Sequence, residues 1–154
     1  MSKLFVLLLS ILSLILEAFA ATELQFVSHK YYNSSELTRL SEYFTGQEYD
    51  GRKIFLRSQK SRDGFYFSFP IPELIVSSSY NYQIMLSIIK RGDSTEEKFS
   101  FELPQNIDNK NEIFVGLTGN DWSHSDELIA WKLVINKMPG QTLFLKKSFL
   151  WDHD

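Results

Sequence analysis

Acidic side chains gather around a tryptophan in the second half of the chain. Asp121, Asp126 and Glu127 lie close to Trp122 in a polar segment, 119–127. Two carboxyl groups can hydrolyse a glycoside when burial keeps one of them protonated. A polar loop seldom buries a carboxyl group, so we interpret the cluster as a solvated loop with Asx-turns. A small hydrolase that uses Glu48 or Asp121 as its acid or base is kept as an alternative.

A second group combines two arginines with nearby acids. Arg57 closes a predicted strand, and Arg62 and Asp63 open the strand that follows. A guanidinium can fork onto a carboxylate, for which Asp63 and Glu48 are the candidates. The pattern predicts either a hairpin pinned by an ion pair, which we favour, or an arginine that is presented to an anionic ligand.

Trp122 follows the residues G-L-T-G-N-D at positions 116–121, in which two glycines end an apolar stretch. A tryptophan in a loop can stack on a sugar ring or anchor a protein partner. More often it folds back and caps the open end of a β-sandwich. We name Arg57, Arg62, Asp121 and Trp122 as the candidate ligand-binding residues, and we expect them at one end of the domain if they act together.

Patterns for other chemistry are missing from the sequence. The chain has no cysteine, which excludes thiol catalysis and thiolate metal sites. Its three histidines, His29, His124 and His153, do not have the spacing of metal ligands. No G-x-S-x-G elbow, phosphate-binding loop or H-E-x-x-H motif occurs. We therefore expect no metal, no cofactor and no catalytic residue.

The first twenty residues have the three parts of a secretory signal. A start with one lysine precedes an apolar run from Leu4 to Leu16, and Ala18 and Ala20 stand at positions −3 and −1 of a cut before Ala21. An uncleaved anchor is the alternative, but a membrane-spanning helix needs about 20 apolar residues. We expect cleavage between Ala20 and Ala21 and no membrane span afterwards. No cysteine follows the run that could carry a bacterial lipid anchor.

The remaining residues 21–154 are enough for one domain. A cysteine-free exported domain is typical of bacteria, so we expect the periplasm or the medium. The signal removes one lysine and one glutamate, so the net charge stays at −3 (15 basic and 18 acidic residues). A chain with this charge balance has no excess of basic residues that would predict binding to nucleic acid or to an anionic membrane.

Aromatic and aliphatic residues alternate with polar ones along most of the mature chain. Glu97–Leu103 is the clearest case, with Phe99, Phe101 and Leu103 on one face. The pattern predicts an all-β fold, an antiparallel immunoglobulin-like sandwich of about seven strands. The predicted strands are Arg52–Arg57, Gly64–Phe69, Tyr80–Lys90, Glu97–Leu103, Ile113–Leu117, Leu128–Ile135 and Thr142–Leu150.

Turn residues separate these strands. We expect hairpins at Ser61–Gly64, Arg91–Ser94 and Met138–Gln141, and a crossover between the sheets at Ile71–Ser79. One segment differs: in Ser35–Phe44, Leu37, Leu40 and Phe44 recur at helical spacing. It predicts one short helix near residues 35–44 that lies across an end of the sandwich.

The order of these motifs resembles a family of uncharacterised small exported bacterial proteins. The similarity covers most of residues 43–151, and it implies no activity and no catalytic residue. Its motifs are Y-F-T-G-x-E at 43–48, L-R at 56–57, R-D-G-x-Y-F at 62–67, G-L-T-G-x-D-W at 116–122, A-W at 130–131 and S-F-L-W at 148–151.

These observations lead to two hypotheses about function. The first is a non-enzymatic exported module that binds a protein partner or a glycan through loops at one end, or through an exposed edge strand. The second is the small hydrolase of an envelope polymer, which requires a cleft with two carboxyls, one of them desolvated. We favour the binding or structural module.

Overall fold

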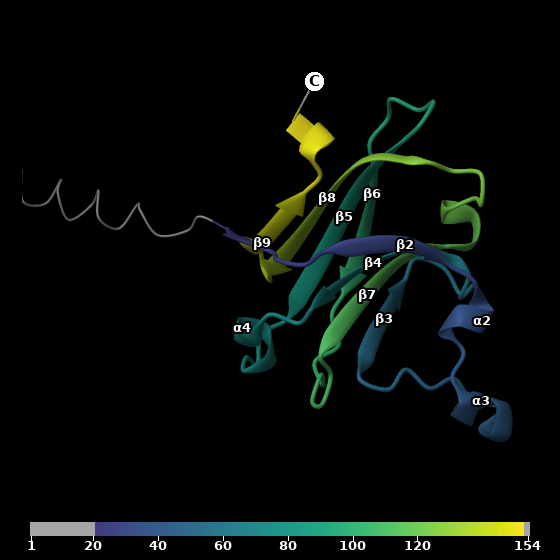
Figure 1. Ribbon diagram of the computed structural model, residues 1–154. Coiled ribbons are helices and arrows are strands. Elements are labelled where there is room, and N and C mark those ends of the chain that lie inside the picture. The colour runs from purple at the N-terminus through teal and green to yellow at the C-terminus, as the bar shows by residue number, and fades with distance from the viewer. Residues whose placement is uncertain (1–20, 153–154) are drawn as a thin grey trace, which may run out of the picture.

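The computed structural model describes residues 21–152. The predicted signal peptide therefore lies outside the described residues and stays a prediction. The described chain is mostly β, with two sheets and a few short helices (Figure 1). Within this part of the chain, no helix is long and apolar enough to cross a membrane.

The strands and helices follow one another in this order: β1 (Thr22–Glu23), β2 (Ser28–Tyr32), α2 (Ser34–Leu37), α3 (Leu40–Thr45), β3 (Lys53–Arg57), β4 (Gly64–Pro70), α4 (Glu73–Val76), β5 (Tyr82–Lys90), β6 (Glu97–Glu102), β7 (Glu112–Thr118), the 3₁₀ turn η1 (Gly119–Asp121), β8 (Leu128–Lys137), β9 (Gln141–Lys147) and the 3₁₀ turn η2 (Phe149–Asp152).

The two sheets are mixed rather than purely antiparallel. The larger sheet has the order β1-β9-β8-β5-β6 and the smaller one β2-β4-β7-β3. The prediction of an antiparallel sandwich is wrong at one edge of each sheet, where β1 runs parallel to β9 and β3 runs parallel to β7. Every other pairing is antiparallel. The partners of both edge strands are distant in sequence, so no local turn signal indicates these pairings.

Alternation along the strands places the core between the sheets, as the sequence predicts. In β4, Phe67 and Phe69 are buried with Ile84, Leu86 and Leu133 of the larger sheet. Their neighbours Tyr66 and Ser68 point to the outer face. Period-two alternation requires this division, since successive side chains of a strand lie on opposite faces.

Two of the three predicted hairpins are confirmed, as is the crossover. β5 and β6 pair across Arg91–Ser94, and β8 and β9 pair across Met138–Gln141. The segment Ile71–Ser79 carries α4 and leads from β4 in the smaller sheet to β5 in the larger one.

The predicted hairpin at Ser61–Gly64 is wrong, because β7 lies between β3 and β4. The connecting residues pass over the end of β7 and bond to Thr118. Its hydroxyl accepts a hydrogen bond from the Gln59 N–H (3.0 Å) and donates one to the Gln59 carbonyl (2.9 Å). The loop therefore satisfies its backbone groups on a distant strand, which a local turn motif does not reveal.

The predicted single helix is two short ones. Thr38 has extended backbone angles and ends α2, and α3 begins after Arg39. The Glu42 carboxylate accepts a hydrogen bond from the Arg39 N–H (3.2 Å), and Gly46 closes α3 in the left-handed conformation, φ +67°. Because Thr38 and Arg39 are extended, α3 does not continue the helix of α2, and its residues do not share one helical face with Leu37.

Candidate binding site

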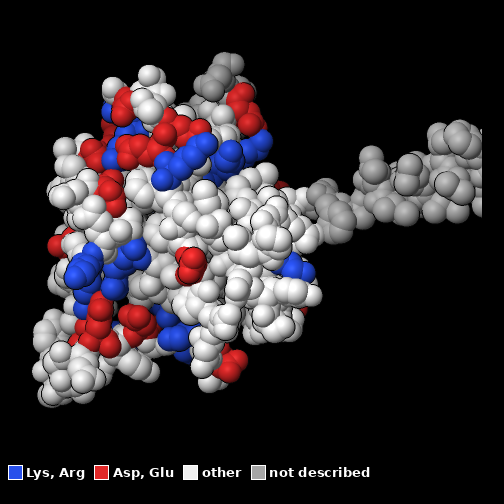
Figure 2. Space-filling view, turned by 180° about the vertical axis from the view of Figure 1, so that it is seen from behind, with Lys and Arg blue, Asp and Glu red and all other residues white. Residues whose placement is uncertain are grey.

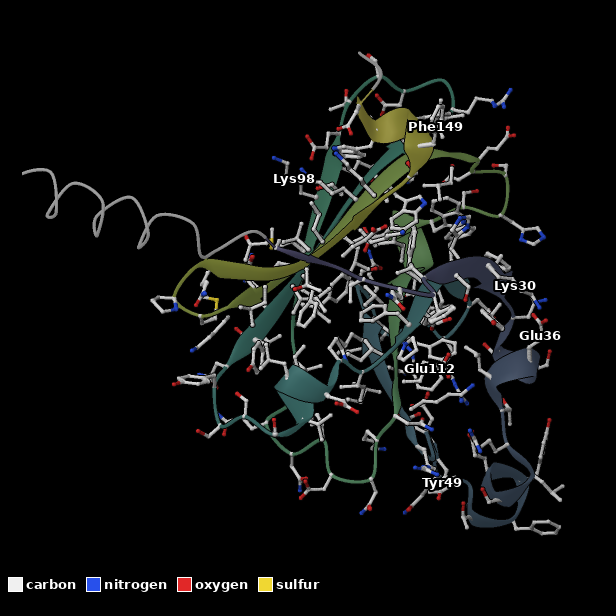
Figure 3. The ribbon with its side chains drawn as sticks, turned by 60° about the vertical axis from the view of Figure 1, so that its left-hand side comes forward. Lys30, Glu36, Tyr49, Lys98, Glu112 and Phe149 are labelled. Carbon is white, nitrogen blue, oxygen red and sulfur yellow. The ribbon has the colours of Figure 1, made fainter. Side chains whose placement is uncertain are left out.

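Residues 33–52, which we call the strap, connect the two edge strands of the smaller sheet. The strap begins after Tyr32 of β2, contains α2 and α3, and rejoins the smaller sheet at β3. Both helices lie outside the sandwich, at the lower right of Figure 1. At its start, Lys30 of β2 forms an ion pair with Glu36 of α2 (3.0 Å; Figure 3).

Arg62 holds the strap to the body of the domain. Its Nη1 donates to Glu42 Oε2 (2.8 Å) and its Nη2 to Glu42 Oε1 (3.3 Å) and to the Leu37 carbonyl (3.2 Å). The Glu42 side chain is only 7% exposed and that of Arg62 18%. Hydrogen bonds from Arg62 lower the pKa of the Glu42 carboxyl to about 2. The predicted ion pair thus exists, with Glu48 and the unpredicted Glu42 as its acids and without Asp63.

Asp63 has a different partner. Its carboxylate accepts hydrogen bonds from the N–H and the hydroxyl of Ser34, at the first residue of α2. These bonds lower the pKa of the Asp63 carboxyl. Lys110 makes the corresponding attachment at the far end of the strap, where its Nζ donates to the Gly51 carbonyl (2.7 Å).

Glu48 bridges the two predicted arginines. Its Oε1 lies 2.9 Å from Arg57 Nη2 and 2.8 Å from Arg62 Nε. These are ion-pair contacts rather than aligned hydrogen bonds. Arg57 Nε also donates to the Tyr66 hydroxyl (3.1 Å), which in turn donates to the Arg62 carbonyl (2.7 Å). Both guanidinium groups therefore already have anionic partners within the chain.

Tyr66 lies flat against β7 on the outer face of the smaller sheet. Gly116 makes this possible, because a Cβ at that position would lie 2.3 Å from the tyrosine ring. Tyr32, Phe55 and Phe114 surround the ring edge-on, at 5.9 to 6.3 Å between centroids. This aromatic cluster packs against the arginine pair, since Arg57 contacts the Tyr66 hydroxyl and lies over the Phe55 ring.

Asp50 is a partly buried acid near the end of the strap. Its Oδ1 is shielded from solvent and has no hydrogen-bond partner among the described residues. Burial raises the pKa of its carboxyl, although the positive charge of Arg57 acts in the opposite direction. Nothing in the local sequence around Asp50 predicts this burial.

The opposite side of the strap is apolar and exposed. Leu40, Tyr43 and Phe44 are 74%, 72% and 82% exposed, and Tyr49 is 57% exposed. We call these four residues the apolar tip. Figure 2, a view from behind, shows the region of α3 as an uncharged lobe at the lower left, with acidic and basic side chains at its base. In Figure 3, Tyr49 lies between α3 and the start of β3.

The apolar tip reverses the expected orientation of the helix. A short helix across the end of a sandwich ordinarily packs its apolar residues on the core, but Leu40 and Phe44 are exposed. In α3, Glu42 takes the inward position, because its carboxylate meets Arg62. Leu40, Tyr43 and Phe44 stand at positions i, i+3 and i+4 and share the outward face.

The remaining two predicted site residues lie at the same end of the domain but not on the same face. The end of β7 places them there: Arg57 of β3 pairs with Gly116, and Gly64 of β4 pairs with Thr118. The turn η1, which holds Asp121, and then Trp122 follow Thr118 directly. Trp122, however, is 5% exposed and stacks on Phe65 within the core (centroids 4.3 Å apart). The structure thus places Arg57 and Arg62 together and Trp122 away from them.

Asp121 takes part in a separate polar contact. Its backbone carbonyl accepts a hydrogen bond from Lys90 Nζ (2.9 Å), which also pairs with Asp126 (3.2 Å) and Glu97 (3.3 Å). Lys90 lies over the Trp122 ring at 5.4 Å from its centroid. This loop is held by a partly buried lysine, which no local pattern in the sequence reveals.

An open cavity of about 310 Å³ lies at the base of the apolar tip, lined in part by Glu42, Glu48, Arg62 and Tyr43. In the described chain, no three acidic or histidine side chains are grouped as they would be around a metal ion.

No family model matches the chain, and no curated protein or solved structure shows significant similarity to it. The resemblance to small exported bacterial proteins stays a prediction.

Proposed function

We propose that the mature domain is an exported, non-enzymatic binding module that attaches to another component of the bacterial envelope through the apolar tip. The observation that carries this proposal is the reversed orientation of α3. The helix directs Glu42 inward and leaves Leu40, Tyr43 and Phe44 in water.

The reversed orientation is unfavourable for an isolated domain. Burial of one large apolar side chain stabilises a protein by roughly 1.5–3 kcal/mol, so α3 forgoes this gain at three positions. Contiguous exposed apolar patches commonly mark interaction sites. Tyrosine and phenylalanine also bring a large contact area with few rotatable bonds. A surface of this composition fits a binding role.

The strand order supports the finer assignment to the immunoglobulin-like class. In that class, strands A, B, E and D form one sheet and strands C, F and G the other, with C′ added in some members. We assign β2, β4 and β7 to A, B and E, and β5, β6, β8 and β9 to C, C′, F and G. β3 takes the place of strand D beside E, although it comes before B in the chain.

The alternative function, hydrolysis of an envelope polymer, requires two accessible carboxyl groups. Asp50 has the raised pKa of a candidate acid, but its Oδ1 is shielded from solvent. Glu48 is engaged by Arg57 and Arg62. These observations favour the binding module.

The test is the distribution of the mature chain, residues 21–154, between isolated bacterial envelopes and the supernatant. We expect the double variant Tyr43→Ser/Phe44→Ser to lose envelope association by about tenfold or more. Phe26→Ser is the matched control, because Phe26 is 81% exposed but lies outside the strap. Equal association of the wild type and the double variant would contradict the proposal.

A further inference from the structure

We propose that the component bound by the apolar tip is the surface of an anionic lipid bilayer, into which Leu40, Tyr43 and Phe44 insert. This inference rests on the proposed function and specifies its partner.

The charges around the tip favour a negatively charged partner. Arg39 immediately precedes α3, and Arg52 is the last residue of the strap. Both side chains are exposed. Among the described residues, neither guanidinium has a carboxylate within ion-pair distance. Arg39 instead lies over the Tyr49 ring, 6.0 Å from its centroid. The two arginines thus flank the apolar tip with uncompensated positive charge.

The acids of the strap do not cancel this charge at the tip. Glu42 and Glu48 pair with the arginines of the body, and Glu36 pairs with Lys30. The Oδ1 of Asp50 is shielded from solvent. The net charge of −3 predicts no attraction to an anionic membrane, but it averages over the whole molecule. In the strap, the acids are thus paired or, at Asp50, partly shielded, whereas Arg39 and Arg52 are exposed.

The form of the tip also fits a lipid surface. The exposed side chains of α3 occupy a projecting, uncharged lobe (Figure 2). Tyrosine favours the membrane–water interface, where its ring is buried and its hydroxyl stays hydrated. A short amphipathic element with aromatic residues on its apolar side and arginines beside it binds by apolar insertion plus attraction to anionic headgroups. Lipid tails adapt to such a lobe without a preformed groove.

The first experiment measures co-sedimentation of the mature chain with vesicles. One set contains phosphatidylcholine alone, and the other contains about one third phosphatidylglycerol. We expect binding to the anionic vesicles, weakened roughly tenfold by Phe44→Ser. Arg39→Gln and Arg52→Gln should each weaken it about fivefold, since each basic residue near the surface adds about that factor. Neither arginine variant should change binding to phosphatidylcholine.

The second experiment reports insertion directly. Because the chain lacks cysteine, Ser41→Cys labels α3 alone with a nitrobenzoxadiazole fluorophore. Ser100→Cys is the matched control, since Ser100 is also exposed but lies on β6 of the other sheet. We expect a blue shift and increased emission on anionic vesicles for the label in α3 and no change for the label in β6.

The outcomes separate this inference from the proposed function. Equal binding of the wild type and Phe44→Ser to vesicles, or equal spectra for the two labels, would overturn the lipid inference. If envelopes still retain the chain in a tip-dependent manner, the partner is a protein or a glycan and the proposed function stands. If neither envelopes nor vesicles respond to the tip, both proposals are wrong. Unchanged thermal unfolding of Phe44→Ser checks that the variant is folded.

Discussion

The Glu42 carboxylate and the Arg62 guanidinium form a two-pronged ion pair across the boundary between the strap and the sandwich. Its two hydrogen bonds measure 2.8 and 3.3 Å, and the residues are 20 positions apart in the chain. The pair determines which way α3 faces, because a six-residue helix cannot direct both Glu42 and Phe44 inward. The exposure of the apolar tip follows from this one contact.

Acid should release the strap. The pKa of Glu42 is lowered from 4.5 to about 2 in the folded state, so its contribution to stability is present above pH 4.5 and is lost as the pH falls through about 2. Glu36 and Asp63 have lowered pKa values and act in the same direction. We expect the protection factors of the α3 amides, which correct for the pH dependence of intrinsic exchange, to fall over this range, as measured by NMR.

Glu42→Gln is the control for this prediction. At pH 7 it should accelerate exchange in α3 about tenfold or more, since a charge-assisted hydrogen-bond pair is lost. The variant should also show a smaller change of amide protection in α3 between pH 4.5 and pH 2, since the substituted glutamine has no carboxyl group to titrate. Slow exchange in α3 of the variant at pH 7 would contradict the role assigned to the ion pair.

Asp50→Asn should stabilise the protein at neutral pH. The pKa of Asp50 is raised in the folded state, so its contribution to stability is greatest below its unfolded pKa of 3.8 and declines as the pH rises through the folded value. Removing the charge should therefore increase the free energy of unfolding at pH 7 by less than about 1 kcal/mol, allowing for solvent screening. Urea unfolding at pH 7 and pH 3 tests this, and a gain of the same size at both values would argue against it.

Gly116→Ala should destabilise the smaller sheet. The added methyl group would lie 2.3 Å from the Tyr66 ring, so the ring must move away from Arg57. Overpacking of this kind costs roughly 1–3 kcal/mol. Thermal unfolding of Gly116→Ala, Tyr66→Leu and the double variant forms a cycle, in which we expect a smaller loss for the double variant than the sum of the two single losses.

Trp122 should matter for folding and not for binding. Its ring stacks on Phe65 in the core, so Trp122→Ala should cost about 3–5 kcal/mol in the free energy of unfolding. Trp122→Phe keeps most of the packing and should leave envelope association unchanged. Loss of association by this folded variant would restore Trp122 as a binding residue.

Much of the sandwich can be predicted from local pattern. Alternation in Glu97–Leu103 and the turn residues at Arg91–Ser94 locate β6 and its hairpin, because a strand and its adjacent turn are encoded by neighbouring residues. The parallel partner of β3 could not be predicted, since Arg57 pairs with Gly116 across 59 positions. β2 was missed because Ser28–Tyr32 carries little apolar alternation.

In the candidate site, too, local sequence pattern predicted some features and long-range contacts decided the others. The sequence alone determined that the chain after residue 20 is a cysteine-free, mostly β domain and that two arginines stand at neighbouring strand ends with acids in reach. Helical spacing in Ser35–Phe44 also located an amphipathic segment, but spacing specifies only which residues share a face. Which face points inward depends on the partner that the rest of the fold presents. Here that partner is Arg62, a partly buried cation that desolvation would penalise without a carboxylate. Only the tertiary structure therefore decided that Glu42 faces the body and the apolar tip faces outward.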